Sequence, residues 1–468
     1  MVKIEKISEY VWEIPQEGEM NVVGRIFASE KLIPSIKDGN TLEQVKNVAC
    51  LPGIVESSIA MSDAHQGYGI CIGGVAAFDL DKGVISPGGV GYDINCSVRL
   101  LATNLTRDDF KGREKEILHS LFRSVPSGVG RGGEMKLEIS ELDRVLVDGA
   151  EWVVNRGCGE KEDLLHIEEN GKMSGCDVSA VSQKAKRRGS SQLGTLGAGN
   201  HFLDVLEVDE IFDKKVAKVF GLKKGQVVIL IHCGSRGLGH QVASDYLQLM
   251  EDEYSEEKLP DRGLVYALIK SELGKKYLSA MACAANFAFA NKQLITHLVR
   301  KDLEHYFPKL EAKVVYELSH NIAKFEKHRG KELLVMRKGA TRSFGPGRKE
   351  IPADYRAVGQ PVLIPGSMGT SSYVLCGTKK AEELSWGSTA HGAGRLKSRT
   401  QAKRDMTFED AQKDMEKRGV FVEFGGRKGF IEESPFSYKD IEEVVRVSHE
   451  VGIGKKVAKL NPFLVVIG

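Results

Sequence analysis

The chain has 468 residues, of which 41% are hydrophobic and 28% are charged, so it can bury a sizeable core and global disorder is excluded. Its 66 Lys and Arg nearly balance its 64 Asp and Glu, so only local clusters of charge can indicate a partner. The N-terminus, MVKIEKISEY, has no apolar signal core, and no stretch approaches the length of a membrane span. We therefore expect a cytoplasmic protein that does not enter a membrane.

The eight cysteines lie far apart in the chain, and no two of them form a CxxC pair. Their spacing therefore indicates neither a zinc ribbon nor a thioredoxin-type redox site. In a reducing compartment, we expect the cysteines to be free thiols or metal ligands, with no disulfide among them.

The first part of the chain, to about Thr103, has the pattern of short strands and turns, and an apolar run at 73–78 is one expected strand. Apolar residues three to four apart predict helices over 107–123 and 141–156. The glycine-rich segment 126–133 between these helices is typical of a mobile loop.

Two apolar, β-branched runs in the second half predict strands at Val227–Ile231 and Ala312–Leu318. Between them, 261–306 has the strongest helical pattern, and we interpret 238–310 as a helical insertion. No linker clearly divides the chain, so we predict that residues 1–468 form a single catalytic α+β domain carrying this insertion.

Four places put a side chain that could bind a metal at a strand end or in a glycine-rich loop. They are Asp93 and Cys96 in GVGYDINCSV, His201 in GTLGAGNHF, His232 in VVILIHCGSRG, and His320 in VVYELSHN. Such a donor set suits one or two divalent transition ions, and composition alone makes zinc the first guess. A lone His after a strand is more often a hydrogen-bonded structural residue, and a sequence does not show that these side chains meet. The neighbouring Cys233 would point to the opposite strand face, where we expect it to pack.

An acid and a base stand two residues apart in DAHQGYG, as Asp63 and His65, directly before glycines. They could position a phosphate or a metal-bound water. The alternative is a turn in which the Asp63 side chain caps backbone amides, and for the motif alone the turn is favoured.

Two basic stretches lie beside candidate site residues: KAKRRG, with Arg187 and Arg188, and the segment after His391, with Arg395 and Arg399. A basic run is usually a solvated face, but here the positions suggest an RNA or nucleotide phosphate. The turn PGSMGTSS at 365–372 could also cradle phosphates. It lacks the Gly-Lys-Ser/Thr ending of a P-loop, which argues against an ordinary P-loop NTPase.

His391 lies in STAHGAGR, where small neighbours leave room for a bulky group on the imidazole. A neutral His can act as a nucleophile and form a covalent intermediate. A structural His at a glycine turn would have the same surroundings, so the motif alone leaves both interpretations open.

Seven motifs, spread in order over nearly the whole chain, resemble the RtcB family of tRNA-splicing and RNA-repair ligases. They are DAHQGYGICIGG (63–74), SPGGVGYDINC (86–96), QLGTLGAGNHF (192–202), HCGSRGLGH (232–240), SHNIAK (319–324), PGSMGTSSY (365–373) and WGSTAHGAGR (386–395). The resemblance implies an α+β fold with a mixed β-sheet core surrounded by helices.

The resemblance also implies a GTP- and Mn²⁺-dependent ligase that joins RNA 3′-phosphate or 2′,3′-cyclic phosphate ends to 5′-hydroxyl ends. His391 would attack the GTP α-phosphate and carry GMP, and the RNA 3′-phosphate would take the GMP to give RNA-ppG. Two Mn²⁺ are implied, bridged by Cys96, with Asp93 and His201 on one ion and His232 and His320 on the other. The family often uses an archease-like activator, which is therefore a candidate partner beside RNA.

By the same resemblance, GTP contacts are expected from Asn200, Phe202, Asp204, His320, Asn321, Pro365, Gly366, Ser367, Met368, Ser371, His391, Gly392, Ala393 and Gly394. Contacts at or near RNA phosphates are expected from Asp63, His65, Arg187, Arg188, Arg395 and Arg399.

Two departures from the family pattern concern the guanine end of the nucleotide. The family often has Glu where this chain has Asp204, and it usually ends in Lys-Gly where this chain ends in Ile467-Gly468. The resemblance therefore supports His391 as the nucleophile more strongly than it supports a preference for guanine. Candidates to replace the lysine are Lys455, Lys456 and Lys459.

Two other functions compete with a ligase. A binuclear metal phosphoesterase would explain the metal-binding residues but has no use for a histidine that carries a nucleotide. A non-catalytic RNA-binding subunit would explain the basic stretches but leaves the five candidate metal ligands without a role.

Overall fold

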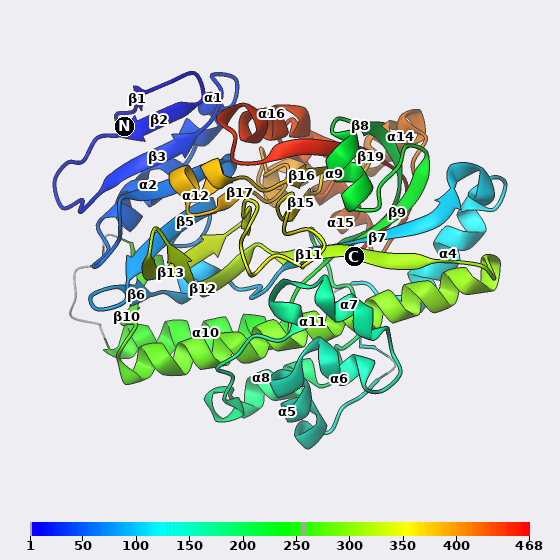
Figure 1. Ribbon diagram of the computed structural model, residues 1–468, viewed down its shortest axis with the longest axis horizontal. Coiled ribbons are helices and arrows are strands. Elements are labelled where there is room, and N and C mark those ends of the chain that lie inside the picture. The colour runs from blue at the N-terminus through cyan, green and yellow to red at the C-terminus, as the bar shows by residue number, and fades with distance from the viewer. Residues whose placement is uncertain (1, 129, 131, 134, 254–258, 260) are drawn as a thin grey trace.

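Two large β-sheets form the core of the computed structural model, which describes residues 2–128, 130, 132–133, 135–253, 259 and 261–468 (Figure 1). The first sheet has seven strands in the order β1-β2-β3-β4-β5-β13-β12. They are β1 (Glu5–Lys6), β2 (Val11–Ile14), β3 (Val23–Phe27), β4 (Ser57–His65), β5 (Ile72–Asp79), β12 (Asn321–His328) and β13 (Lys331–Lys338). Only β3 and β4 pair in parallel among these neighbours.

The second sheet has eight strands, in the order β11-β7-β9-β8-β19-β16-β15, with β18 pairing in parallel with β19. They are β7 (Ser97–Thr106), β8 (Phe202–Ile211), β9 (Gln226–Cys233), β11 (Ala312–Ser319), β15 (Pro361–Ile364), β16 (Ser372–Cys376), β18 (Phe421–Phe424) and β19 (Lys455–Ile467). Two short pairs complete the strands: β6 (Val84–Ile85) with β10 (Ala267–Leu268), and β14 (Ala340–Arg342) with β17 (Ser388–Ala390). Both large sheets are mixed, so the expected α+β class with a mixed sheet core is confirmed.

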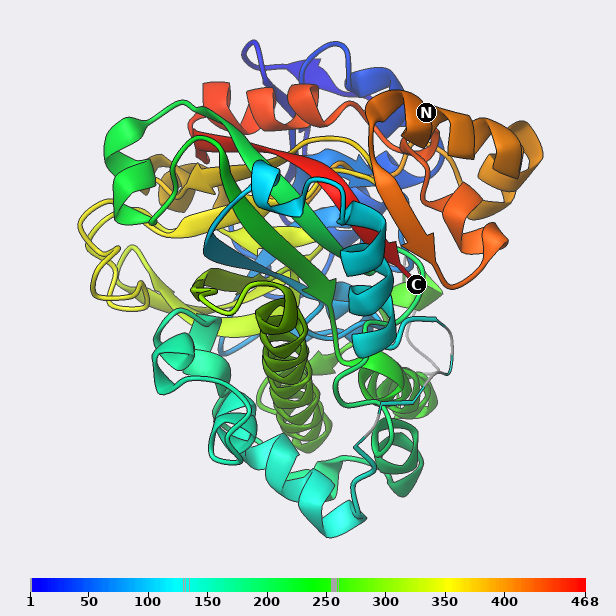
Figure 2. The ribbon, with the colours of Figure 1, turned by 90° about the vertical axis from the view of Figure 1, so that its right-hand side faces the viewer.

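Helices surround the two sheets. The first half contains α1 (Ile33–Lys37), α2 (Thr41–Ala49), α3 (Pro87–Val90), α4 (Glu114–Ser124), α5 (Ile139–Asp148), α6 (Ala150–Val154), α7 (Lys161–Leu165), α8 (Gln183–Gly189) and α9 (Lys214–Val219). The second half contains α10 (Arg236–Glu253), α11 (Glu272–Tyr306), α12 (Lys379–Ser385), α13 (Arg399–Asp405), α14 (Phe408–Arg418), α15 (Arg427–Glu432) and α16 (Ile441–Val451). Figure 2 shows α13, α14 and α15 grouped on the side of the molecule where the chain ends.

The longest helix, α11, runs beside α10 beneath the sheets, and α5 and α6 pack on its other side (Figure 1). Ala284 and Phe287 belong to the apolar core shared with these helices, whereas Ile295 and Val299 pack against the second sheet. The helix is therefore covered on two sides, by other helices on one and by the second sheet on the other.

The predicted elements are largely present, with shifted boundaries. The expected helix over 261–306 begins only at Glu272, because the Ser271 side chain accepts from the Gly274 N–H at its start (3.0 Å). The expected helix over 141–156 is two helices, α5 and α6, separated at Gly149, which has a left-handed φ of 58°. The insertion at 238–310, which holds most of α10 and all of α11, stays a prediction.

The loop expected at 126–133 falls partly outside the described residues, at 129 and 131. Its described part is tied to the segment before His201. The Gly128 N–H donates to the Gly197 carbonyl (2.7 Å), and the Gly133 N–H donates to the Ser191 carbonyl (2.8 Å).

The prediction of no disulfide is wrong, because Cys176 and Cys283 are bonded. They are 107 residues apart in sequence, but the fold brings their Cα atoms within 5.0 Å, inside the range that a disulfide can bridge. Sequence spacing cannot reveal such a pair. Within the described part of the chain, no helix combines the length and apolarity needed to cross a membrane.

Candidate active site

Asp93 and Cys96 lie in the tight turn that leads into β7. Gly91 (φ 97°) and Asn95 (φ 54°) have left-handed backbone conformations there, and the Cys96 N–H donates to the Asp93 carbonyl (3.0 Å). The buried Asn95 side chain is held in place because its Nδ2 donates to the Ala285 carbonyl of α11 (2.9 Å). The turn therefore directs both candidate ligands toward one point, as their spacing predicts.

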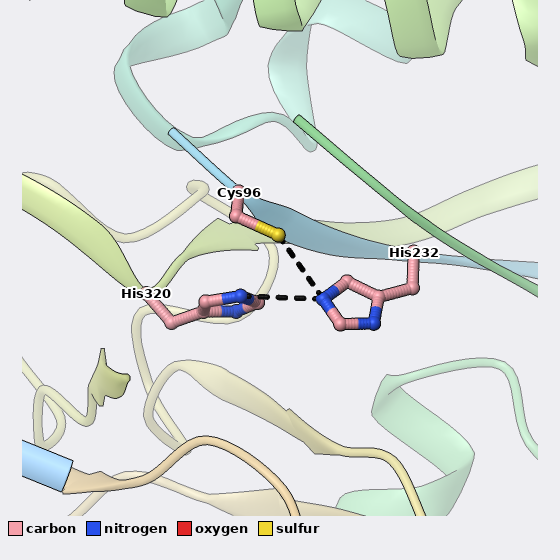
Figure 3. A group of neighbouring side chains, drawn as sticks. All are labelled: Cys96, His232 and His320. Carbon is pink, nitrogen blue, oxygen red and sulfur yellow. Dashed lines mark hydrogen bonds between the residues drawn. The ribbon is translucent and has the colours of Figure 1, made fainter. Parts of the chain in front are cut away.

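The three candidate histidines come from the ends of three strands of the second sheet, β8, β9 and β11, and meet this turn. His201 directly precedes β8, His232 is near the end of β9, and His320 joins β11 to β12. Cys96 Sγ lies 3.4 Å from His201 Nε2 and 3.2 Å from His232 Nε2. The Nε2 atoms of His232 and His320 are 3.2 Å apart, and His201 Nε2 is 2.8 Å from Asp93 Oδ2 (Figure 3 shows Cys96, His232 and His320).

These five side chains form two groups that share Cys96. One group is Cys96, His232 and His320, the other is Asp93, Cys96 and His201, and within each the ligand atoms lie within 4.8 Å of one another. Ligand atoms of one tetrahedral ion are separated by roughly 3.3–3.6 Å when the bonds are about 2.0–2.3 Å long. The Sγ–Nε2 and Nε2–Nε2 distances come close to this range, so each group could hold a metal ion, and Cys96 belongs to both.

Burial sets the protonation of this cluster. It lowers the pKa values of His232 and His320 well below the ordinary range, so both imidazoles are neutral and can offer a lone pair to a cation. Burial, together with the Asp93 carboxylate, raises the pKa of the Cys96 thiol well above its usual value. A buried thiol of this kind gives up its proton when a cation binds beside it.

Asn291 of α11 ties two of the ligand-bearing segments together. Its fully buried Oδ1 accepts from the N–H groups of Gly194 (2.7 Å) and Thr195 (3.1 Å). Its Nδ2 donates to the Thr195 carbonyl (3.1 Å) and to Cys233 Sγ (3.2 Å). The Cys233 side chain is fully buried in the apolar core of the second sheet and belongs to neither candidate ligand group, as its predicted packing role requires. The importance of Asn291 is missed in the sequence, because a single Asn within a helical pattern carries no signal.

His391 is paired with Asp63, which lies on β4 and is fully buried. The Asp63 Oδ2 atom is 2.5 Å from His391 Nδ1 and also accepts from the backbone N–H groups of His391 (2.9 Å) and Gly392 (3.3 Å). Burial alone would raise the pKa of Asp63, but the charge and hydrogen bonds of His391 hold it below its ordinary value. An ionised Asp63 accepts the Nδ1 proton, so His391 Nε2 is the nitrogen with a free lone pair.

The His391 ring lies beside the metal-ligand cluster and in the wall of a cavity. Its centroid is 4.9 Å from that of His320, and the cavity measures about 720 Å³. Of the residues expected to contact GTP, the following line the cavity: Asn200, Phe202, Pro365, Gly366, Ser367, Met368, His391, Gly392, Ala393 and Gly394. The volume is in the range of cavities that hold small ligands.

The other residues expected at GTP lie around this cavity without lining it. The Asn321 side chain donates to the Asp93 carbonyl (3.1 Å) and accepts from the Gly339 N–H (2.9 Å). Ser371 Oγ donates to Asn461 Oδ1 (2.8 Å). These contacts brace the walls, and His320 belongs to the metal-ligand cluster.

Asp204 is buried in β8, behind the cavity wall, where it pairs in register with Val465 of β19. Burial raises the pKa of this carboxyl well above its ordinary value, and its Oδ1 has no hydrogen-bond partner among the described residues. At this position the side chain is shorter by one methylene than the Glu expected from the family pattern.

None of the lysines proposed to replace the terminal Lys reaches the cavity. Ile467, at the end of β19, lines the cavity, whereas Lys459 lies eight residues earlier, which is roughly 26 Å along a strand. Lys459 instead pairs with Glu442 (2.7 Å). Lys455 and Lys456 lie still further back on the same strand.

The residues expected near RNA phosphates fall into two places. His65, Arg395 and Arg399 line the cavity, and Arg399 keeps 54% of its side chain exposed. Arg187 and Arg188 are exposed on α8 and do not line the cavity. Asp63 differs from all of these, because it is fully buried behind His391. The Asp63–His391 contact is missed in the sequence, because 328 residues separate its members.

Comparison with known proteins shows the family to which the chain belongs. The family model for tRNA-splicing ligase RtcB matches residues 44–468. The chain is 52% identical to the tRNA-splicing ligase RtcB of Nanoarchaeum equitans, covering 100% of both chains. It is 51% identical to the proteins of the same name from Thermococcus kodakarensis and Pyrobaculum aerophilum, covering 100% of this chain and 99% of each relative. The chain therefore belongs to the RtcB family of tRNA-splicing ligases.

Proposed function

We propose that this protein is a GTP- and Mn²⁺-dependent RNA ligase. It joins an RNA 3′-phosphate or 2′,3′-cyclic phosphate end to a 5′-hydroxyl end, on tRNA halves or on broken RNA. The observation that carries the proposal is the position of His391. Its Nδ1 is held by Asp63, and its ring lies 4.9 Å from that of His320, at the junction of the cavity and the metal-ligand cluster.

In the first step, His391 Nε2 attacks the α-phosphorus of GTP. A P–N bond forms, the bond to the bridging oxygen breaks, and pyrophosphate leaves. The imidazole becomes positively charged as this bond forms, and the Asp63 carboxylate on Nδ1 stabilises that charge. The small residues that follow, Gly392 and Ala393, leave space for the nucleotide in the cavity.

In the second step, an oxygen of the RNA 3′-phosphate attacks the same phosphorus and the P–N bond breaks, which gives RNA-ppG and frees His391. In the third step, the 5′-hydroxyl of the other strand attacks the RNA 3′-phosphate, loses its proton, and GMP leaves. Arg399 lines the cavity with 54% of its side chain exposed, so it can bind phosphate oxygens during these steps. Arg395 also lines the cavity, but its guanidinium donates to Glu433 and Tyr438. Two Mn²⁺ held by Asp93, Cys96, His201, His232 and His320 would neutralise phosphate charge and align the reacting oxygens.

A binuclear phosphoesterase is the main alternative, because it would use the same metal ligands. It gives no role to the Asp63–His391 pair, in which one buried carboxylate oxygen accepts from the ring and from two backbone N–H groups. Such a pair can orient the imidazole for nucleophilic attack, a step that the ligase requires and metal-assisted hydrolysis does not.

The test is transfer of label from α-labelled GTP in the presence of Mn²⁺. We expect the wild-type protein to form an acid-labile adduct that is absent when Mn²⁺ is chelated and absent in His391→Ala. His305→Ala removes an exposed histidine near the end of α11 and should keep the adduct. Adduct formation by His391→Ala at the wild-type rate would refute the proposed nucleophile.

A further inference from the structure

A second large cavity lies at the opposite end of the eight-stranded sheet from the metal ligands. It measures about 960 Å³ and is formed by α9, the turn that leads into β9, and the edge strand β11. Gln226 lines this cavity, and His232 lies six residues further along β9, which is roughly 20 Å away. The cavity is therefore separate from the one that contains His391.

Lysines are concentrated at this cavity. Five exposed lysines lie on α9 and the turn after it: Lys214, Lys215, Lys218, Lys223 and Lys224. All of them except Lys215 line the cavity, which we call the lysine groove. Among the described residues, none of the five ammonium groups has an ion-pair or hydrogen-bond partner. Five like charges within eleven residues repel one another, so the free protein gains nothing from gathering them.

Most of the nearby carboxylates contact groups other than these five lysines. Asp213 caps α9 by accepting from the Lys215 and Val216 N–H groups (both 3.0 Å). Asp354 pairs with His166 (2.9 Å), and Glu311 lies 3.8 Å from the Lys313 ammonium. Glu210 is the remaining acid of the lining.

The basic residues near His391 show the opposite arrangement. Lys397 pairs with Asp405 (3.0 Å), and Lys403 pairs with Glu432 (2.7 Å). Their charges are balanced within the protein, whereas those of the lysine groove are not. Unbalanced surface cations favour a polyanion, because each phosphate contact releases a counterion from the nucleic acid.

We propose that the lysine groove binds backbone phosphates in the body of the RNA substrate, away from the ends being joined. This inference rests on the proposed function, in which the protein acts on RNA. The groove lies roughly 20 Å from the candidate metal ligands along β9, which is short compared with an A-form RNA stem of two helical turns. One stem whose broken end lies at His391 is therefore long enough to reach the groove, whereas a short oligonucleotide is not.

The experiment compares two triple variants with the same change in charge. One is Lys218→Glu, Lys223→Glu and Lys224→Glu, and its control is Lys276→Glu, Lys327→Glu and Lys331→Glu, at exposed positions on α11 and in the first sheet. The probes are a nicked RNA hairpin with a stem of roughly two helical turns and a short single-stranded RNA with the same 3′-phosphate end. Kd is measured for each probe over a range of salt concentrations, without GTP.

We expect the groove triple to bind the hairpin at least about tenfold more weakly than the control triple, with its salt slope reduced by about 3. Both triples should bind the short RNA equally. A second variant has Gln in place of the same three groove lysines and so adds no negative charge. It should show the same reduction in the salt slope, because that reduction comes from lost phosphate contacts and not from repulsion by the new glutamates. If the groove variant and the control variant bind the hairpin with equal affinity and equal salt slope, the proposal is overturned. The groove would then be assigned to another partner, such as an acidic protein.

Failure of this inference can be told apart from failure of the ligase proposal. Histidyl-GMP formation is measured on the same wild-type preparation with GTP and Mn²⁺ but without RNA. Absence of that adduct would contradict the ligase mechanism alone, because the hairpin affinities are measured without nucleotide.

Discussion

The contact between Asp63 and His391 determines which imidazole nitrogen can react. Three N–H groups converge on one buried carboxylate oxygen, and two of them belong to the backbone of the His391 turn. This arrangement fixes the orientation of the ring as well as its tautomer. The motif DAHQGYG draws attention to Asp63 in the sequence, but its partner there is unknown, because periodicity and spacing do not report contacts between residues 328 apart.

Asp63→Asn should slow formation of the GMP adduct by roughly 10²- to 10⁴-fold, because an amide neither stabilises the positive imidazole nor selects the correct tautomer. The rate is measured in a single turnover with saturating GTP and Mn²⁺. Metal binding should stay near the wild-type value, since Asp63 is not among the metal ligands. A rate within about threefold of wild type would show that Asp63 does not orient the nucleophile.

Helix α11 is the element that organises the candidate metal ligands. Its helical pattern is plain in the sequence, and so are the apolar strands that end in His232 and His320. The sequence does not reveal that fully buried polar side chains of this helix reach the ligand-bearing loops. A periodic sequence pattern does not distinguish a buried Asn from an exposed one. The difference becomes clear only when the helix is seen packed between two layers.

Two buried asparagines of α11 allow a matched test of this role. Asn291 holds the loop before His201 and the end of β9, whereas Asn286 accepts from the Met173 N–H (2.7 Å) and donates to the Leu146 carbonyl (2.8 Å). Both variants to Ala should lose stability, because each leaves buried backbone groups unpaired. Only Asn291→Ala should also weaken metal binding, by about 10- to 100-fold, because it frees the loops that orient the ligands.

The measurement is titration of the metal-free proteins with Co²⁺, followed by the absorption of the bound ion. Asn286→Ala serves as the control for a general loss of stability. Equal Co²⁺ affinities for the two variants would assign Asn291 a purely structural role.

Over the whole molecule, the features that sequence analysis misses are long-range contacts. The class of fold with its mixed sheet core follows from the family motifs, and the candidate metal ligands are proposed from local patterns; the division into two large sheets is not predicted. The bond between Cys176 and Cys283 does not, because it depends on how the segment before α8 packs on α11. The free cysteines are the other six: Cys50, Cys71, Cys96, Cys158, Cys233 and Cys376.

Thiol titration of the unfolded protein should therefore detect six thiols without reductant and eight after reduction. Cys176→Ser should lower the free energy of unfolding by about 2–4 kcal/mol, because the bond closes a loop of 107 residues in the unfolded chain. Cys158→Ser, which changes a free and partly exposed thiol, is the control in urea unfolding. Eight reactive thiols in the unreduced protein would show that the bond does not form.

The central claim is that His391 carries the nucleotide, and mapping the modified residue tests it most directly. The protein is incubated with GTP and Mn²⁺, digested at neutral to alkaline pH, and its peptides are examined by tandem mass spectrometry. We predict GMP on the peptide that contains His391, attached to the imidazole and lost on treatment with acid. GMP on a lysine, or its absence from every peptide while RNA ends are still joined, would contradict the account.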